Sequence, residues 1–182
     1  MGKIAFVLGG ARSGKSAWAE RRALELEAEG RTVVYIATCE CRPEDAEMND
    51  RIARHRSRRP SSWSTVEAPF AVAEELERLT PGTVALLDCL SLWVSNLLLA
   101  APERGYEATS DETLKIVEEL LDSARRSSAD IIIVSNETGW GVVPPSRLGR
   151  LYRDILGWAN QAVAREADEV WLLVAGLPQR IK

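Results

Sequence analysis

A glycine-rich run near the amino end of the sequence has the composition of a phosphate-binding loop. Residues 9–16 read Gly-Gly-Ala-Arg-Ser-Gly-Lys-Ser and match the spacing G-x-x-x-x-G-K-S, directly after an apolar run and before a segment of helical periodicity. Glycines let the backbone curl so that its N–H groups point at phosphate oxygens, and the helix start adds positive potential. In this pattern Lys15 bridges the β- and γ-phosphates and Ser16 is a ligand of Mg²⁺. The alternative, a glycine-rich turn with an incidental lysine, fits the flanking segments less well.

A second candidate is a carboxylate at the end of another apolar run. Asp88 directly follows residues 84–87, Val-Ala-Leu-Leu. In phosphate-binding folds such an acid holds Mg²⁺, either directly or through water. We therefore expect Ser16 and Asp88 to be the metal ligands. Asp88 is also suited to cap a following helix, and the two roles are compatible.

The third candidate is His55, the one histidine of the chain, which lies in an arginine-rich segment. On a helix, Arg51, His55 and Arg59 are spaced by four and share a face. Cationic neighbours favour a neutral imidazole, which can attack phosphorus and hold it as a phosphoramidate. The local pattern alone favours a plainer interpretation, a solvated basic face or an RNA-binding arm. A single histidine without clustered ligands makes a zinc site improbable.

Short apolar runs that alternate with helical segments must position these residues. We expect strands at 4–8, 32–38, 83–87, 131–135 and 170–174, with a short edge strand at 63–67. Helices are expected at 16–29, 43–59, 71–79, from 88 to 99, at 111–123 with Ser110 as its cap, and at 147–167. Loops are expected at 101–110 and 139–146. This alternation predicts one α/β domain, residues 1–182, with a mostly parallel sheet covered by helices on both faces.

Composition narrows the class of protein further. The chain has 182 residues, 23 Lys+Arg, 27 Asp+Glu, a net charge of −4 and 46% hydrophobic residues, which excludes disordered and fibrous classes. Mild acidity argues against nucleic-acid binding. The longest apolar run, 85–101, contains Asp88 and three other polar residues, so we expect no membrane insertion. The three cysteines form no C-x-x-C pair and no signal-peptide pattern is present, so we expect a cytoplasmic protein.

Several further motifs together resemble one enzyme family. Beside the loop at 9–16, they are Tyr-Ile-Ala-Thr at 35–38, the block from Glu47 to Pro60 that contains His55, residues 88–96 (Asp-Cys-Leu-Ser-Leu-Trp-Val-Ser-Asn) and residues 136–144 (Asn-Glu-Thr-Gly-Trp-Gly-Val-Val-Pro). From residue 4 to 182 the chain resembles the bifunctional adenosylcobinamide kinase / adenosylcobinamide-phosphate guanylyltransferase family of cobalamin biosynthesis. The phosphate-binding loop alone is unspecific, but the histidine block and the 136–144 block are not shared with ordinary kinases of this fold.

This resemblance implies two reactions. The hydroxyl of adenosylcobinamide is phosphorylated by ATP or GTP, and GMP is then transferred from GTP to adenosylcobinamide phosphate, releasing pyrophosphate. The family's nucleophilic histidine matches His55, with Lys15 stabilising the leaving group. The resemblance also implies a RecA-like P-loop fold, Mg²⁺ with the nucleotide, and homo-oligomers, with a trimer known. Nucleotide contacts are implied at Gly9, Gly10, Ala11, Arg12, Ser13, Gly14, Lys15, Ser16, Ala37, Thr38, Cys39, Arg56, Ser57, Arg58, Arg59, Glu67 and Asp88.

Some roles and two other function classes stay open at this point. Glu137 is either a general base, part of the corrinoid pocket or the cap of a turn, and Trp140 either stacks on the corrin or packs between subunits. A simple P-loop kinase would transfer phosphate without a covalent nucleotide on His55. A RecA-type regulatory ATPase would hydrolyse slowly and depend on partners, but the chain lacks a basic surface excess or an extension for polymerising.

Overall fold

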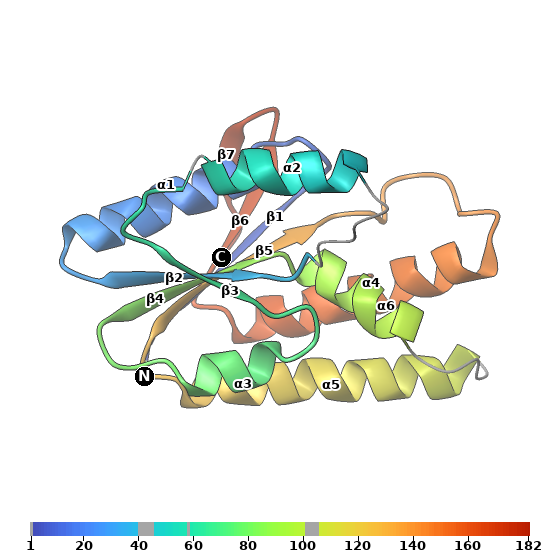
Figure 1. Ribbon diagram of the computed structural model, residues 1–182. Coiled ribbons are helices and arrows are strands. Elements are labelled where there is room, and N and C mark those ends of the chain that lie inside the picture. The colour runs from blue at the N-terminus through green and yellow to red at the C-terminus, as the bar shows by residue number, and fades with distance from the viewer. Residues whose placement is uncertain (1, 40–45, 58, 101–105) are drawn as a thin grey trace.

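The computed structural model describes residues 2–39, 46–57, 59–100 and 106–182 (Figure 1). Its centre is a seven-stranded sheet with the order β3-β2-β4-β5-β1-β6-β7. The strands are β1 (Ile4–Gly9), β2 (Thr32–Ala37), β3 (Ser64–Glu67), β4 (Thr83–Asp88), β5 (Asp130–Asn136), β6 (Glu169–Val174) and β7 (Leu177–Arg180). Every neighbouring pair is parallel except β6 and β7. The predicted mostly parallel α/β sheet is therefore confirmed.

In the described part of the chain, six helices cover the two faces of this sheet. They are α1 (Lys15–Ala28), α2 (Ala46–Ser57), α3 (Val72–Glu77), α4 (Leu90–Ala100), α5 (Tyr106–Arg126) and α6 (Arg147–Glu166). Figure 1 shows α1 and α2 on one side and α3, α5 and α6 on the other, with α4 beside α6. None of the described helices is long and apolar enough to cross a membrane.

Strand alternation divides the buried side chains between two cores. On β1, Ala5 and Val7 pack with Ala19 and Ala23 of α1 in one core. The other core, between the sheet and α3 to α6, contains Phe6 together with residues of those helices. Successive side chains of a strand point to opposite faces, so a strand covered on both sides reads as a continuous apolar run. For this reason the apolar runs in the sequence predicted the bounds of the buried strands to within a few residues.

Two expectations about local structure are wrong. Helix α5 begins at Tyr106, so Ser110 lies inside it and does not cap it. Thr109, Ser110 and Thr113 are all buried, and the Thr113 hydroxyl donates to the Thr109 carbonyl (2.8 Å), so polar side chains that resembled a helix start are accommodated within the helix. Residues 101–105 of the expected loop lie outside the described residues.

The second error concerns the segment after residue 174, where no strand was expected. There β7 pairs antiparallel with β6 through a tight turn in which Ala175 and Gly176 have positive φ values of 51° and 83°. Its four residues are all exposed, so they lack the apolar alternation by which a strand is found.

A buried polar link joins β5 to α6. Asn160, which is 6% exposed, accepts a hydrogen bond from the Ser135 hydroxyl (2.8 Å) and donates one to the Asn136 carbonyl (3.1 Å). A buried polar group that loses its partner costs about 1–3 kcal/mol. The link therefore fixes the carboxyl end of β5 against the helix.

We expect Asn160→Ala to lower the free energy of unfolding by about 1–3 kcal/mol, because the Ser135 hydroxyl and the Asn136 carbonyl both lose a buried partner. Urea unfolding measures this. The matched control is Gln161→Ala, at the next, exposed position of α6, which should change the free energy by less than about 0.5 kcal/mol. Equal effects of the two substitutions would contradict the structural role of Asn160.

Candidate active site

The glycine-rich loop connects the carboxyl end of β1 to the first residue of α1. Gly14, directly before the helix, has φ of 94°, and Arg12 has φ of 59°. The Ser13 N–H donates to the Gly10 carbonyl (3.2 Å), which closes the loop on itself. From outside, the Gly176 N–H of the β6–β7 turn donates to the Ser13 carbonyl (2.8 Å). The loop is thus curled and supported from behind, as a phosphate cradle requires.

Lys15 is folded back over this loop. Its side chain is 9% exposed, and its ammonium donates to the Gly10 carbonyl (3.1 Å). Burial lowers the pKa of Lys15, while the neighbouring Cys89 and Asp88 act in the opposite direction. A cation enclosed by loop backbone and short of compensating charge is well suited to receive the phosphates of a nucleotide.

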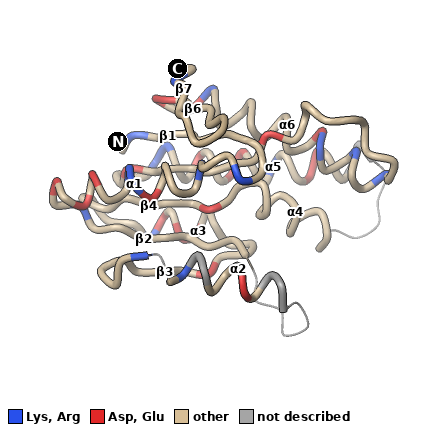
Figure 2. Tube along the Cα trace, turned by 90° about the horizontal axis from the view of Figure 1, so that it is seen from above, with Lys and Arg blue, Asp and Glu red and all other residues tan. Residues whose placement is uncertain are grey.

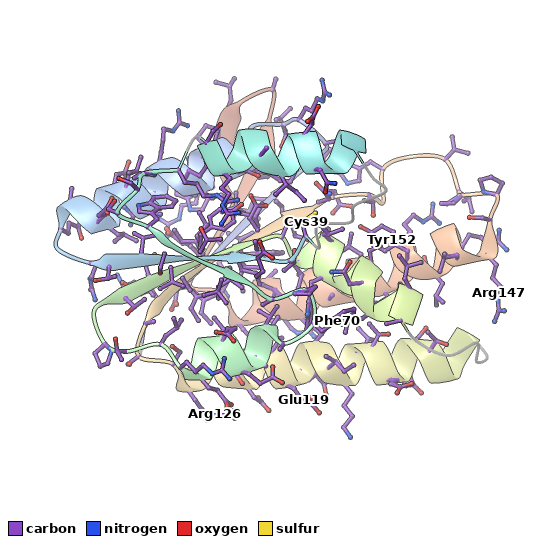
Figure 3. All side chains as sticks on the ribbon, in the orientation of Figure 1. Cys39, Phe70, Glu119, Arg126, Arg147 and Tyr152 are labelled. Carbon is purple, nitrogen blue, oxygen red and sulfur yellow. The ribbon has the colours of Figure 1, made fainter. Side chains whose placement is uncertain are left out.

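Asp88 is aligned with two other predicted site residues across three neighbouring strands. In the strand register Ala37 is opposite Glu67 on β3 and opposite Asp88 on β4. Since carboxyl ends of parallel strands meet at one edge of a sheet, the register brings these three residues to the edge that also carries the glycine-rich loop. Cys39 follows β2 and lies between α2 and α4 in the view of Figure 3.

Two side chains of the β2 segment fix the end of β4. The Tyr35 hydroxyl donates to the Asp88 carboxylate (2.8 Å), and burial together with that carboxylate raises the pKa of Tyr35, so the phenol keeps its proton. The Thr38 hydroxyl accepts from the Cys89 N–H (3.0 Å) and donates to the Cys89 carbonyl (2.9 Å). Thr38, which was expected to contact nucleotide, is fully buried, and its hydroxyl is hydrogen-bonded to the backbone of Cys89.

Residues 47–57 of the histidine block lie on α2, the helix before β3. His55 is on α2, but its side chain lies outside the described residues, as does the whole of Arg58. Arg56 and Ser57 are exposed at the end of the helix. Arg59 places its guanidinium 3.3 Å from the centre of the Tyr35 ring and donates to the Thr65 hydroxyl (3.3 Å). Arg59 therefore anchors the end of α2 to the sheet.

Tyr35 and Asn136 are two residues of the site that sequence reasoning did not single out for a role. Tyr35 is two positions before Ala37 and therefore on the same strand face, a signal that the quoted Tyr-Ile-Ala-Thr motif contained. Asn136 is opposite Gly9 in the sheet register, and its Oδ1 atom is buried without a hydrogen-bond partner among the described residues. Glu137 caps the next turn, because its carboxylate accepts from the Gly139 N–H (2.7 Å).

Comparison with known proteins gives a match over almost the whole chain. Residues 5–181 match the family described as cobinamide kinase / cobinamide phosphate guanyltransferase. The chain belongs to this family. The bifunctional adenosylcobalamin biosynthesis protein CobP of Pseudomonas aeruginosa is 45% identical over 97% of this chain and 95% of its own length. The corresponding protein CobU of Escherichia coli is 40% identical over 97% of this chain and 98% of its own length.

Solved structures with low sequence identity share the fold. The flagellar accessory protein FlaH of Methanocaldococcus jannaschii has a TM-score of 0.50 at 14% identity, covering 99% of this chain and 78% of its own. A solved ATPase domain has a TM-score of 0.53 at 13% identity, covering 93% of this chain and 68% of its own. These similarities confirm the P-loop fold expected for a member of the cobinamide kinase / guanyltransferase family, which is an enzyme of cobalamin biosynthesis.

The first two glycines of the loop provide a matched pair of substitutions. A Cβ at Gly9 would lie 2.7 Å from the Leu173 carbonyl oxygen and closer still to the Ser13 hydroxyl, whereas a Cβ at Gly10 meets nothing within 4 Å. We expect Gly9→Ala to lower the free energy of unfolding by about 1–3 kcal/mol, because backbone has to move. Gly10→Ala should lower it by less than about 1 kcal/mol. Urea unfolding of both variants, without nucleotide, measures the difference, and a larger loss for Gly10→Ala would contradict the loop geometry.

Proposed function

We propose that this enzyme phosphorylates the hydroxyl of adenosylcobinamide with a nucleoside triphosphate, and that it then transfers GMP from GTP to adenosylcobinamide phosphate through a covalent intermediate on His55. The main support is the family match over residues 5–181. In addition, the glycine-rich loop follows the carboxyl end of β1, Asp88 ends β4 and Ala37 ends β2, all at one edge of the sheet, and α2 is the next described helix after β2.

The residues predicted for the nucleotide site would act in three ways: on the phosphates, on the rest of the nucleotide, or by positioning other residues. Gly9 to Ser16 would surround the phosphates, and Lys15 would neutralise charge that develops on the departing phosphate. Arg56 and Ser57 at the end of α2, and Arg58, the next residue in the sequence, would contact the rest of the nucleotide together with Ala37, Cys39 and Glu67. Thr38 and Arg59 contribute by positioning, since the described contacts of both side chains are to protein groups.

Mg²⁺ fits the donor set that this edge provides. Ser16 and Asp88 offer a hydroxyl and a carboxylate, the hard oxygen ligands that Mg²⁺ prefers. In the described part of the chain no three His, Cys, Asp or Glu side chains form a metal cage, and Mg²⁺ needs none when substrate phosphates supply further ligands. The buried Ser13 Oγ and Asn136 Oδ1 atoms, both without partners among described residues and both beside Gly9, also suit an occupied loop. Bound Mg²⁺ would supply charge neutralisation on the phosphates.

The two reactions use the same loop but break different bonds. In the first, the hydroxyl oxygen of the substrate attacks the γ-phosphorus, the bond to the β-phosphate oxygen breaks, and the hydroxyl proton is released. In the second, an imidazole nitrogen of His55 attacks the α-phosphorus of GTP and pyrophosphate leaves. A phosphate oxygen of the phosphorylated substrate then attacks the same phosphorus, forming the diphosphate and restoring the free imidazole.

We further propose that residues 1–182 act as a single domain, that the enzyme works in the cytoplasm without nucleic acid or membrane insertion, and that it forms homo-oligomers such as a trimer. One continuous sheet that includes every described strand supports the single domain. The net charge of −4 supports the absence of nucleic acid.

Incubation with GTP and Mg²⁺ should leave one GMP residue on the wild-type protein and none on His55→Ala, because only the imidazole forms the phosphoramidate. Intact-mass spectrometry measures the adduct, and mild acid should remove it. His55→Asn serves as a second variant that keeps a polar side chain. GTP binding by all three proteins is checked by equilibrium dialysis. If the wild-type protein binds GTP but carries no adduct, the covalent intermediate on His55 is contradicted, and of the two proposed reactions only the phosphorylation stays.

Tyr35→Phe should raise the Mg²⁺ concentration for half-maximal activity about tenfold, because the Asp88 carboxylate loses the donor that orients it while the ring stays beneath Arg59. Steady-state rates at varied Mg²⁺ measure this. Tyr152→Phe is the matched control, since the half-buried Tyr152 phenol, whose pKa burial raises to about 12, donates to the Ser91 carbonyl (3.2 Å) and to no carboxylate among the described residues. An equal shift in both variants would contradict the role of Tyr35.

A further inference from the structure

After Glu137, the loop between β5 and α6 carries no charged residue and exposes large apolar side chains. Residues 138–146 contain no Lys, Arg, Asp or Glu, so the tube that leads into the start of α6 is tan over these residues in Figure 2. Trp140 is 79% exposed, Val142 95% and Val143 58%, and Leu148 on the first turn of α6 is 48% exposed. Four large apolar side chains within nine residues of sequence are therefore exposed, and we call these four the apolar patch. Exposed apolar side chains that gather on a surface mark sites of interaction.

The shape of this loop is fixed by contacts at both ends. The Glu137 carboxylate accepts from the Gly139 N–H (2.7 Å), and the Ser146 hydroxyl accepts from the Gly149 N–H (3.1 Å). Arg150 donates to the Pro144 carbonyl (3.1 Å) and to the Pro145 carbonyl (2.7 Å). Arg147, labelled in Figure 3, marks the far end of the loop, where α6 begins. These bonds fix the backbone of the loop at its two ends, and the apolar side chains between them are exposed.

The patch lies close to the proposed phosphate site. The Glu137 N–H donates to the Gly9 carbonyl (3.1 Å), so the loop starts in direct contact with the glycine-rich loop. Trp140 follows three residues later, and three residues of extended chain span at most about 11 Å. A substrate whose reacting group lies at the glycine-rich loop therefore has its next part within reach of Trp140.

Cobinamide has the chemistry that such a patch can bind. Its corrin macrocycle is broad, nearly flat and bordered by methyl groups and amide side chains, and its reacting hydroxyl lies at the end of a short arm. An indole can stack on the macrocycle and valine side chains can cover its methyl groups. We infer that Trp140, Val142, Val143 and Leu148 form the corrin-binding surface, which holds the macrocycle while the arm reaches the phosphates. This inference rests on the proposed function.

Substitutions at this surface should separate corrinoid binding from nucleotide chemistry. Trp140→Ala and Val142→Ser should each raise KM for cobinamide phosphate about tenfold, because both remove apolar contact from a broad ligand. Trp140→Phe should restore most of the affinity. KM for GTP and the amount of GMP adduct formed without corrinoid should stay within about twofold of wild type. Steady-state kinetics and intact-mass spectrometry measure the two effects.

The matched control is Trp158→Ala. Trp158 lies on α6, the helix that also carries Leu148. It is 42% exposed and lines a hollow of about 450 Å³ between α5 and α6. It lies eleven residues beyond the start of α6, about 16 Å along the helix. We expect this variant to leave KM for cobinamide phosphate unchanged.

Three results would overturn the inference. The first is an unchanged KM for cobinamide phosphate in both Trp140→Ala and Val142→Ser, and the second is an equal rise of that KM in Trp158→Ala. The third is a change of oligomer mass, measured by light scattering, in Trp140→Ala or Val142→Ser together with loss of both reactions. That result would make the patch an interface between copies of the chain. Failure of the proposed function is distinguishable from these, because wild-type protein would then form no GMP adduct. In that case equilibrium dialysis with cobinamide, detected by its visible absorbance, tests the surface directly, and equal binding by wild type and Trp140→Ala would contradict it.

Discussion

The lateral connection between the ends of β2 and β4 is the constraint on which the proposed site depends. Tyr35 holds the Asp88 side chain, and Thr38 holds both backbone groups of Cys89. From the other side, the Asn96 amide donates to the Thr38 carbonyl (2.8 Å) and to the Pro69 carbonyl (3.0 Å), which brings α4 and the segment after β3 to the same point. Backbone that leaves a sheet loses its ladder partners, so polar groups at strand ends need side chains or other loops. Here the side chains that satisfy them also fix the position of the carboxylate proposed to hold the metal.

The electrostatics of the edge follow from this arrangement. Lys15 is buried by its own loop, which lowers its pKa, and nearby Asp88 acts against that decrease. Burial also raises the pKa of the Cys89 thiol to about 11, with Asp88 contributing, so the thiol stays protonated near neutral pH. Arg59 lies over the Tyr35 ring, which brings a further positive charge near the proposed phosphate site without an opposing carboxylate among its described contacts. Two cations, the buried Lys15 and the half-buried Arg59, therefore lie near this edge without a described ion pair to a carboxylate, and this favours a polyanionic ligand.

Much of the fold and of the candidate site could be predicted from the sequence, because the local rules of strand, turn and helix formation determine them. The curl between Gly9 and Lys15 follows from glycine conformation and helix geometry, and the position of Asp88 follows from the length of its apolar strand. Features that depend on contacts between distant segments could not be predicted in this way. The role of Arg59 is decided by an aromatic ring 24 positions earlier, and β7 is defined by its pairing with β6 and not by its own composition. Ser110 fails as a cap because its burial in α5, not its preference as a single residue, determines its place.

The sheet order also affects how the chain folds during synthesis. β1, the first strand made, pairs on one side with β5 and on the other with β6, and the Ser13 carbonyl is held by the backbone of Gly176. Until residues 169–176 have left the ribosome, β1 has an open edge and the glycine-rich loop has nothing behind it. A nascent chain that already carries every residue of the phosphate-binding motif should therefore not yet retain GTP. Nucleotide binding then becomes one of the last events of folding. The late strand β6 also covers the open edge of β1, which until then is available for pairing with another chain.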